Sequence, residues 1–214
     1  MSEENQIISS DQNNTGIKSV LLNNKKLIII FFTIILIILF SYFFYNDYKK
    51  DIKLQISEKY NLALINYNKN NSPTSTSVMK NLIMARDTTY SPLALYFLLD
   101  NELLKDKQEI NRYFDVLINE TNLETEVKNL IIYKKGLYNS NSATEEELLN
   151  IFKPLINNDN LWRSHSLYII AEYFFSKDEK QKSKEFFEKI LEMDNSNPQI
   201  KIEAQKRLQR DFGV

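Results

Sequence analysis

The chain has 214 residues, of which 43% are hydrophobic and 26% charged, and its 27 basic and 28 acidic side chains leave a net charge of −1. This balance, without a basic run, argues against nucleic acid as a partner. The absence of cysteine excludes disulfides, thiolate catalysis and cysteine-ligated metals, and the presence of only three glycines argues against a turn-rich β fold.

Residues 1–24 are polar and show no apolar period, so we predict a disordered tail there. Leu27 to Tyr45 then form an uncharged run without Gly or Pro. As a helix the run is about 29 Å long, close to the ~30 Å hydrocarbon core of a bilayer. A cleavable signal peptide has a shorter apolar region and ends at small residues, whereas this run ends in an aromatic belt. We therefore predict a single transmembrane helix over 25–46.

Charge does not decide which side of the membrane the rest of the chain faces. Three lysines precede the run, and four lysines follow it between residues 49 and 59. Lys49, Lys50 and Lys53 could contact anionic headgroups or form an ordinary solvated flank, and both readings stay open.

The pattern after the run is helical throughout. Apolar residues at three- and four-residue steps predict a first segment from Lys49 to Asn68 that continues the membrane helix outward. Turn-forming residues at 68–77 then interrupt it, and Val78 to Arg86 resumes a short helix. We therefore divide the remainder into a juxtamembrane helix and linker, 47–77, and a helical domain, 78–214.

Capping patterns mark further helix starts. Ser91-Pro92 and Asn197-Pro198 place a capping side chain before proline. Thr121 with Glu124 and Thr144 with Glu147 fit the capping box, Asp178 can cap a helix, and Pro154 is expected to end or kink its helix. The predicted helices are 91–105, 107–119, 122–138, 144–153, 160–176, 179–193 and 198–210.

Two of these helices suggest the architecture. Segment 160–176 has one apolar stripe with Leu167 and Phe174 and a second with Trp162 and Tyr173, so it must be covered on two sides. Segment 179–193 has a single stripe and a charged back. Such alternation is typical of stacked helical hairpins.

Residues 164–197 resemble a degenerate tetratricopeptide repeat. Ala171 and Ser183 stand at the small positions, where they let two helix backbones approach, and Phe174 and Phe187 fill the space beside them. The resemblance implies an all-α fold in which a tetratricopeptide-like α-solenoid of antiparallel helical hairpins follows the transmembrane helix.

The arrangement as a whole resembles the ancillary SecYEG translocon subunit family (YfgM-like). The segments that carry this resemblance are Thr88 to Leu104, Asn158 to Leu191 and the closing helix to Arg210. The resemblance implies a bacterial inner-membrane protein with a cytoplasmic N-terminus and a periplasmic helical domain. It also implies partners among Sec translocon components and periplasmic chaperones or clients, and it brings no catalytic residues.

The sequence contains no pattern that favours enzyme chemistry. His165 is the only histidine, so an ordinary transition-metal site is not expected and a structural role is preferred. The three glutamates at 145–147 suit the first turn of a helix better than a calcium or catalytic site. No phosphate loop, nucleophile elbow or metalloprotease helix is present. We predict no enzyme, no catalytic residues, no cofactor and no metal.

Four aromatic residues are candidates for protein contact. Tyr90, Tyr96, Trp162 and Tyr168 either pack in the core or line a concave groove for a peptide or partner helix. We expect a membrane-tethered protein-binding scaffold that contacts the bilayer and other proteins, with an accessory role at the Sec translocon in periplasmic or envelope protein biogenesis. The alternatives are a scaffold of another inner-membrane assembly, such as division or cytochrome maturation, and a structural subunit that packs through its transmembrane helix.

Overall fold

The computed structural model describes residues 25–68 and 72–213 and divides the chain into two compact units between Leu54 and Gln55. Within these residues the protein is all-α and contains no strand, which confirms the predicted class. The predicted tail, 1–24, lies outside the described residues.

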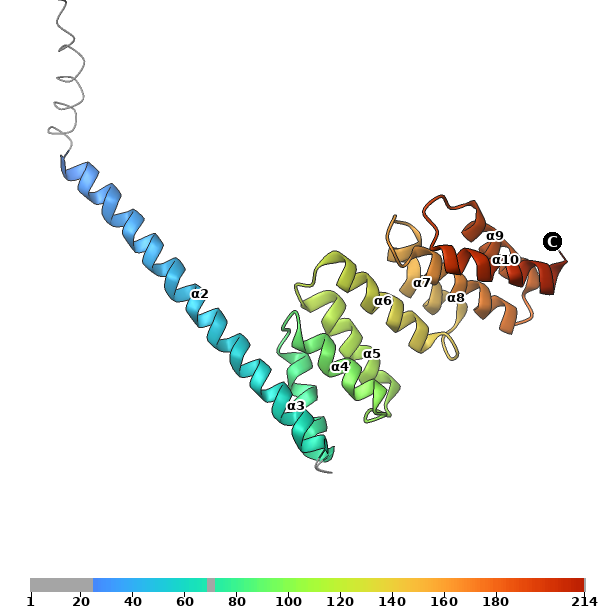
Figure 1. The fold of residues 1–214 in the computed structure, drawn as a ribbon, viewed down its shortest axis with the longest axis horizontal. Helices are drawn as coiled ribbons and strands as arrows, with labels where there is room; N and C mark the ends of the chain where they lie inside the picture. The colour runs from blue at the N-terminus through green and yellow to red at the C-terminus, as the bar shows by residue number, and fades with distance from the viewer. Residues whose placement is uncertain (1–24, 69–71, 214) are drawn as a thin grey trace, which may run out of the picture. The chain divides into compact units, whose positions relative to one another are not determined.

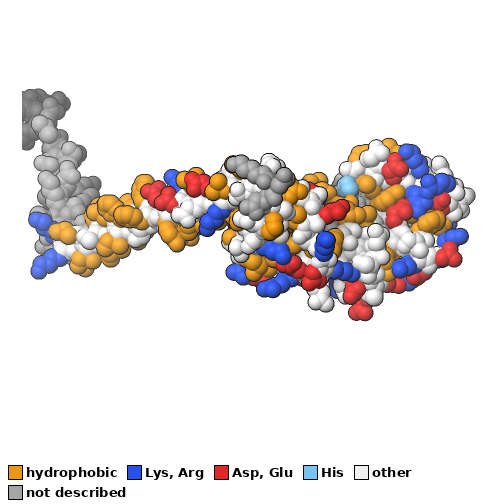
Figure 2. All heavy atoms as spheres, turned by 90° about the horizontal axis from the view of Figure 1, so that it is seen from below, with side chains coloured by type: hydrophobic (Ala, Val, Ile, Leu, Met, Phe, Trp, Pro, Cys, Tyr) orange, Lys and Arg blue, Asp and Glu red, His pale blue; other side chains and the backbone are white. Residues whose placement is uncertain are grey.

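The long N-terminal helix, α2, comprises Lys25–Asn68 and crosses the division between the units (Figure 1). It confirms that the helix of the apolar run continues to Asn68. Between Ile29 and Tyr45 every side chain is exposed except Ile35, which is half-buried, and Figure 2 shows hydrophobic side chains along this part. By length and composition α2 is the one helix in the described part of the chain that could cross a membrane.

One polar side chain within the apolar run is satisfied internally. The Thr33 hydroxyl donates to the Ile29 carbonyl one turn earlier, at 2.8 Å. This bond pairs the hydroxyl donor of Thr33 within the helix, as an apolar environment would require.

The second unit consists of the end of α2 and a series of shorter helices. Short turns join most of them, and α3 packs on α4, α6 on α7, and α9 on both α8 and α10. Their bounds are α3 Ser72–Met84, α4 Tyr90–Asp100, α5 Lys107–Asp115, the π-helix η1 Val116–Glu120, α6 Thr125–Asn139, α7 Glu145–Ile156, α8 Arg163–Ser176, α9 Lys180–Glu192 and α10 Pro198–Phe212.

Two predicted helix starts are confirmed. Thr144 caps α7 in a reciprocal capping box, in which the Glu147 carboxylate accepts from the Thr144 backbone at 2.8 Å. Asn197 caps α10 by accepting from the amides of Gln199 and Ile200, and Pro198 occupies the first turn.

The predicted cap at Ser91 is wrong. Its side chain is buried and donates to the Leu82 carbonyl at 2.6 Å, so it joins α4 to α3. Asp87 instead binds free backbone amides near the start of α4, because its carboxylate accepts from the amides of Thr89 and Tyr90.

The predicted caps at Thr121 and Asp178 are also wrong. Thr121 donates to the Val116 carbonyl at 3.1 Å, and α6 begins at Thr125, after Glu124. Asp178 has a positive φ of 61° and precedes the N-cap of α9. Both residues therefore lie in turns that connect two helices, and neither is the N-cap that the local pattern predicted.

Two further boundaries differ from expectation. Helix α3 begins at Ser72, inside the segment predicted as a linker, and Ser75 donates to the Ala63 carbonyl of α2 at 2.8 Å. Pro154 does not end α7, which continues to Ile156. Pro154 has no N–H to donate to the Asn150 carbonyl four residues earlier. The helix tolerates the proline because both residues are exposed, so water can bond to this carbonyl.

The apolar core consists of three clusters arranged along the chain. The first contains residues from α2 to α6, the second residues from α6 to α8, and the third residues from α8 to α10. Helix α8 supplies Ile170 and Phe174 to the second cluster and Leu167 and Ala171 to the third. This confirms that α8 is covered on two sides, but Leu167 and Phe174, which were predicted to share one stripe, lie in different clusters. Helix α9 buries one stripe, and its charged residues are exposed or half-buried.

Candidate functional site

The four candidate aromatic residues lie in different parts of the second unit. Tyr96 packs against the first core cluster, Trp162 against the second and Tyr168 against the third. Tyr90 lies at the start of α4, where its hydroxyl donates to Ser57 at 2.8 Å. The structure therefore does not bring these four side chains into one groove.

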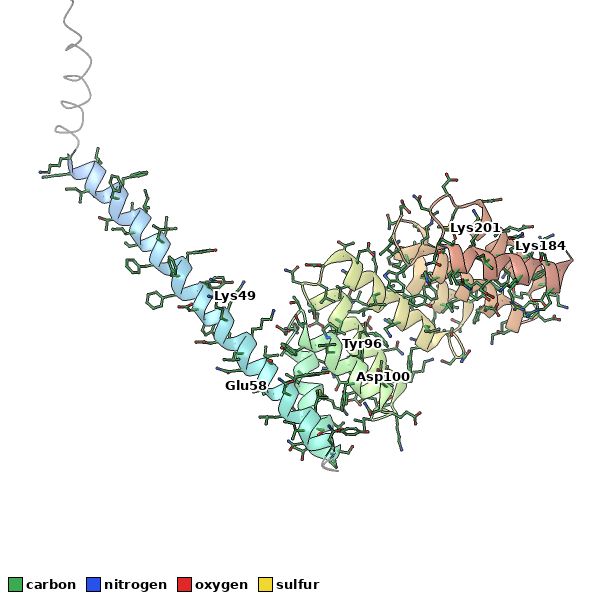
Figure 3. The ribbon with its side chains drawn as sticks, in the orientation of Figure 1. Lys49, Glu58, Tyr96, Asp100, Lys184 and Lys201 are labelled. Carbon is green, nitrogen blue, oxygen red and sulfur yellow. The ribbon has the colours of Figure 1, made fainter. Side chains whose placement is uncertain are left out.

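Tyr96 is held within α4, where Figure 3 labels it. Burial raises the pKa of its hydroxyl to about 12. Lys134 lies 4.7 Å from the centre of its ring and gives it a cation–π contact. These contacts are those of a packed side chain.

Tyr168 also packs inside the unit. Its ring meets Phe187 of α9 edge-on at 5.4 Å between centroids. Burial is the main cause that raises the pKa of Tyr168, and the neighbouring Glu172 carboxylate adds to it.

Trp162 borders a surface hollow of the second unit. It precedes α8, and its amide donates to the Asn160 side chain at 2.9 Å. The Asn160 amide group in turn donates to the carbonyls of Leu155 and Asn158, both at 2.9 Å. These bonds hold the connection between α7 and α8 in a defined shape.

Three aromatic rings gather at this point. Tyr133 of α6 stacks on Trp162 with 5.1 Å between centroids and 25° between planes. His165 lies 5.4 Å from Trp162 and 5.9 Å from Tyr133. Tyr133 does not line the hollow, so it supports the indole ring while Trp162 and His165 form part of the wall.

The hollow has a volume of about 720 Å³ and lies where three parts of the chain meet. These are the first turn of α6, the connection between α7 and α8, and the connection between α9 and α10. Its lining residues are Glu126, Asp159, Asn160, Leu161, Trp162, His165, Asn195, Ser196, Asn197 and Pro198. The Asn197 backbone amide donates to the Ser164 hydroxyl at 3.2 Å and so joins the connection between α9 and α10 to the first turn of α8.

Of the residues that line this hollow, the sequence analysis proposed only Trp162 for protein contact, and it gave His165 a structural role and Asn197 a capping role. Leu161 is 71% exposed, which is unusual for a large apolar side chain beside an aromatic cluster. The asparagine-rich segments 157–160 and 195–197 were the available signal in the sequence. Both segments form hydrogen bonds to the start of α8.

A second hollow of about 710 Å³ lies beside α5. Its charges are mixed, since Arg86, Lys107 and Arg112 line it together with three carboxylates, and Arg86 is already paired with Glu120. The hollow beside Trp162 is the better candidate for binding because it joins apolar and polar surface without internal ion pairs.

No group of three His, Asp or Glu side chains in residues 25–68 and 72–213 is placed to hold a metal ion. No family model, curated protein or solved structure shows a significant match to this chain.

His165 provides a direct probe of the site. Burial lowers its pKa from 6.5, because the charged imidazole loses hydration. The unfolded chain therefore takes up its proton at higher pH than the folded chain, and stability falls as the pH drops from 6.5 toward the folded pKa. Since the chain has one histidine, a single NMR titration should show a midpoint below 6.5.

The His165→Gln variant is the control for this titration. It should lose less stability than the natural chain over the same pH interval, because Gln takes up no proton. A midpoint at or above 6.5 would show that the imidazole is not desolvated.

Proposed function

We propose that this protein is a single-pass, membrane-tethered scaffold that binds other proteins. The observation that carries the proposal is the exposure of the apolar side chains of α2 between Ile29 and Tyr45. Hydrophobic surface on every side of a helix is stable only where lipid or protein covers it. The uncharged run is long enough for a bilayer.

The rest of the chain is proposed to be a tetratricopeptide-like α-solenoid of helical hairpins. Ala171 and Ser183, at the two small positions of the repeat pattern, are both fully buried between α8 and α9. The burial of α8 on two sides also supports stacking of successive helices. An extended helical array offers a broad surface for a protein partner.

The proposed mechanism is tethering. Anchoring confines the helical domain to the membrane surface, which raises its effective concentration near a membrane-bound partner. No covalent chemistry is required of the chain in this role.

We further propose, from the resemblance described above, that the scaffold is an accessory factor of the Sec translocon. The helical domain would then lie in the periplasm of a bacterium and meet emerging envelope proteins or the chaperones that receive them. A scaffold of a division or cytochrome-maturation assembly is the alternative within the same class, and a structural membrane subunit is the alternative outside it.

The membrane anchor makes a simple prediction. The full-length protein should stay with membranes after alkaline carbonate extraction and enter solution only with detergent, because the apolar run prefers hydrocarbon to water. Its intact mass should include the residues before the run. A soluble product, or a mature chain that begins after Tyr45, would contradict the anchor.

The partner is tested by in vivo crosslinking and purification of the intact protein. Recovery of Sec components supports the translocon role, and their absence removes it. Replacing residues 25–46 with an unrelated span is the control, since a tether keeps its partners after this change and a helix-packing subunit loses them. A C-terminal reporter that is active in the cytoplasm would reverse the proposed topology.

A further inference from the structure

We propose that the hollow beside Trp162 binds an extended segment of a partner protein that presents a lysine or arginine side chain next to an apolar one. This inference rests on the proposed scaffold function and names the chemistry of the segment that the scaffold would hold. It is carried by the charge of the hollow, its aromatic wall and its exposed leucine.

The charge of the hollow is negative. In the part of the chain that the structure describes, Glu126 and Asp159 are the charged residues that line it, and no lysine or arginine does so. Arg163 follows Trp162 in the chain but faces elsewhere, because its Nε donates to the Ile156 carbonyl at 3.1 Å and it lines a different hollow. A cationic ligand therefore meets two carboxylates and, among the described residues that line the hollow, no lysine or arginine.

The aromatic wall favours the same ligand. An indole ring is the best aromatic partner for ammonium and guanidinium groups. Tyr133 and His165 hold the Trp162 ring by their ring contacts, so the ring is already in place before a ligand arrives. A positioned ring loses less entropy on binding than a mobile one.

The apolar part of the ligand has its own contact. Leu161 is 71% exposed, and the neighbouring Pro198 is also exposed. An apolar side chain next to the cation would cover Leu161. The asparagine side chains of the rim can meet the polar backbone of an extended segment, since amides both donate and accept.

Trp162 is the only tryptophan in the chain, so its fluorescence reports on this hollow alone. The test uses the full-length protein in nanodiscs of neutral phosphatidylcholine and a tryptophan-free peptide in which Lys alternates with Leu. This peptide should change the emission of Trp162 in a saturable manner. Matched peptides with Glu in place of Lys, or Ser in place of Leu, should bind at least roughly fivefold more weakly.

Variants of the protein separate specific binding from general attraction. Glu126→Gln with Asp159→Asn should weaken binding of the Lys–Leu peptide roughly fivefold to tenfold, and added salt should reduce the difference. Leu161→Ser tests the apolar contact without disturbing the core, since this side chain is exposed. The charge-matched control is Asp100→Asn with Glu146→Gln, which removes two exposed carboxylates outside the hollow.

Several results would overturn the inference. These are an unchanged Trp162 emission with the Lys–Leu peptide, equal binding of the Glu peptide, or equal weakening by the control variant. A response to glycerophosphocholine alone would assign the hollow to a lipid headgroup, and a response to protein concentration alone would assign it to a second copy. If these results appear while the full-length protein still crosslinks to other proteins in membranes, the hollow is not the binding site. The proposed scaffold function is then retained.

Discussion

Replacing Gly136 with alanine should destabilise the second unit by about 2 kcal/mol. Gly136 lies in α6, and a Cβ atom added there would be 2.2 Å from Cζ and 2.3 Å from Cε1 of Phe152 in α7. Phe152 is fully buried, so its ring cannot swing into solvent. The gain of about 1 kcal/mol that alanine brings to a helix interior is smaller than the overpacking penalty.

The measurement is urea and thermal unfolding of the full-length chain in detergent, followed by far-UV circular dichroism and Trp162 fluorescence. The midpoint temperature should fall by about 4–8 °C. The matched control is Phe152→Leu, alone and with Gly136→Ala, because the smaller side chain removes the clash. The double variant should be more stable than the sum of the single effects by about 1 kcal/mol or more. Strict additivity would show that the ring does not obstruct the new methyl group.

Replacing Arg207 with methionine should cost about 2–3 kcal/mol. Arg207 of α10 has a side chain only 10% exposed and forms two bonds to the Glu172 carboxylate of α8, Nε–Oε1 at 2.6 Å and Nη2–Oε2 at 2.8 Å. It also pairs with Asp211, and its guanidinium lies 4.3 Å from the centre of the Phe175 ring. Removing it leaves the Glu172 carboxylate without its arginine partner, whereas Asp211 keeps its pair with Arg210 at 2.9 Å. The cost stays below that of a fully buried pair because Glu172 is 36% exposed.

Unfolding measurements on two further variants identify the cause of this loss. Arg207→Lys keeps the charge but loses the forked geometry, so its stability should lie between those of Arg207→Met and the natural chain. Combining Arg207→Met with Glu172→Gln and Asp211→Asn should recover much of the loss, since no unpaired carboxylate remains. If the triple variant is less stable than Arg207→Met alone, packing of the arginine rather than charge pairing is the main contribution.

Local patterns predicted those features that depend on residues a few positions apart. The Thr144–Glu147 capping box and the Asn197 cap were found because each pair of partners lies within one helical turn. The two apolar stripes of α8 also sufficed to predict that this helix is covered on two sides. Apolar residues at three- and four-residue steps after Lys49 predicted a helix through Asn68 for the same reason.

The same local rules failed at Ser91 and Thr121, where a more favourable acceptor was present. Ser91 has the sequence environment of a cap, but the Leu82 carbonyl of the preceding helix lies within hydrogen-bond distance. Thr121 follows the π-helix η1 and donates to the carbonyl of Val116, its first residue, and no periodicity indicated this helix. A buried hydroxyl takes the partner that packing provides, and packing is not visible in a short window.

The sequence by itself determined an all-helical chain, one helix apolar enough for a membrane, and which helices bury one or two faces, because helical periodicity and capping act over a single turn. Only the tertiary structure decided the hollow beside Trp162, the Arg207 network and the contact of Gly136 with Phe152. The Asn197–Ser164 and Arg207–Glu172 bonds join residues 33 and 35 positions apart, so they exist only once the helices have packed.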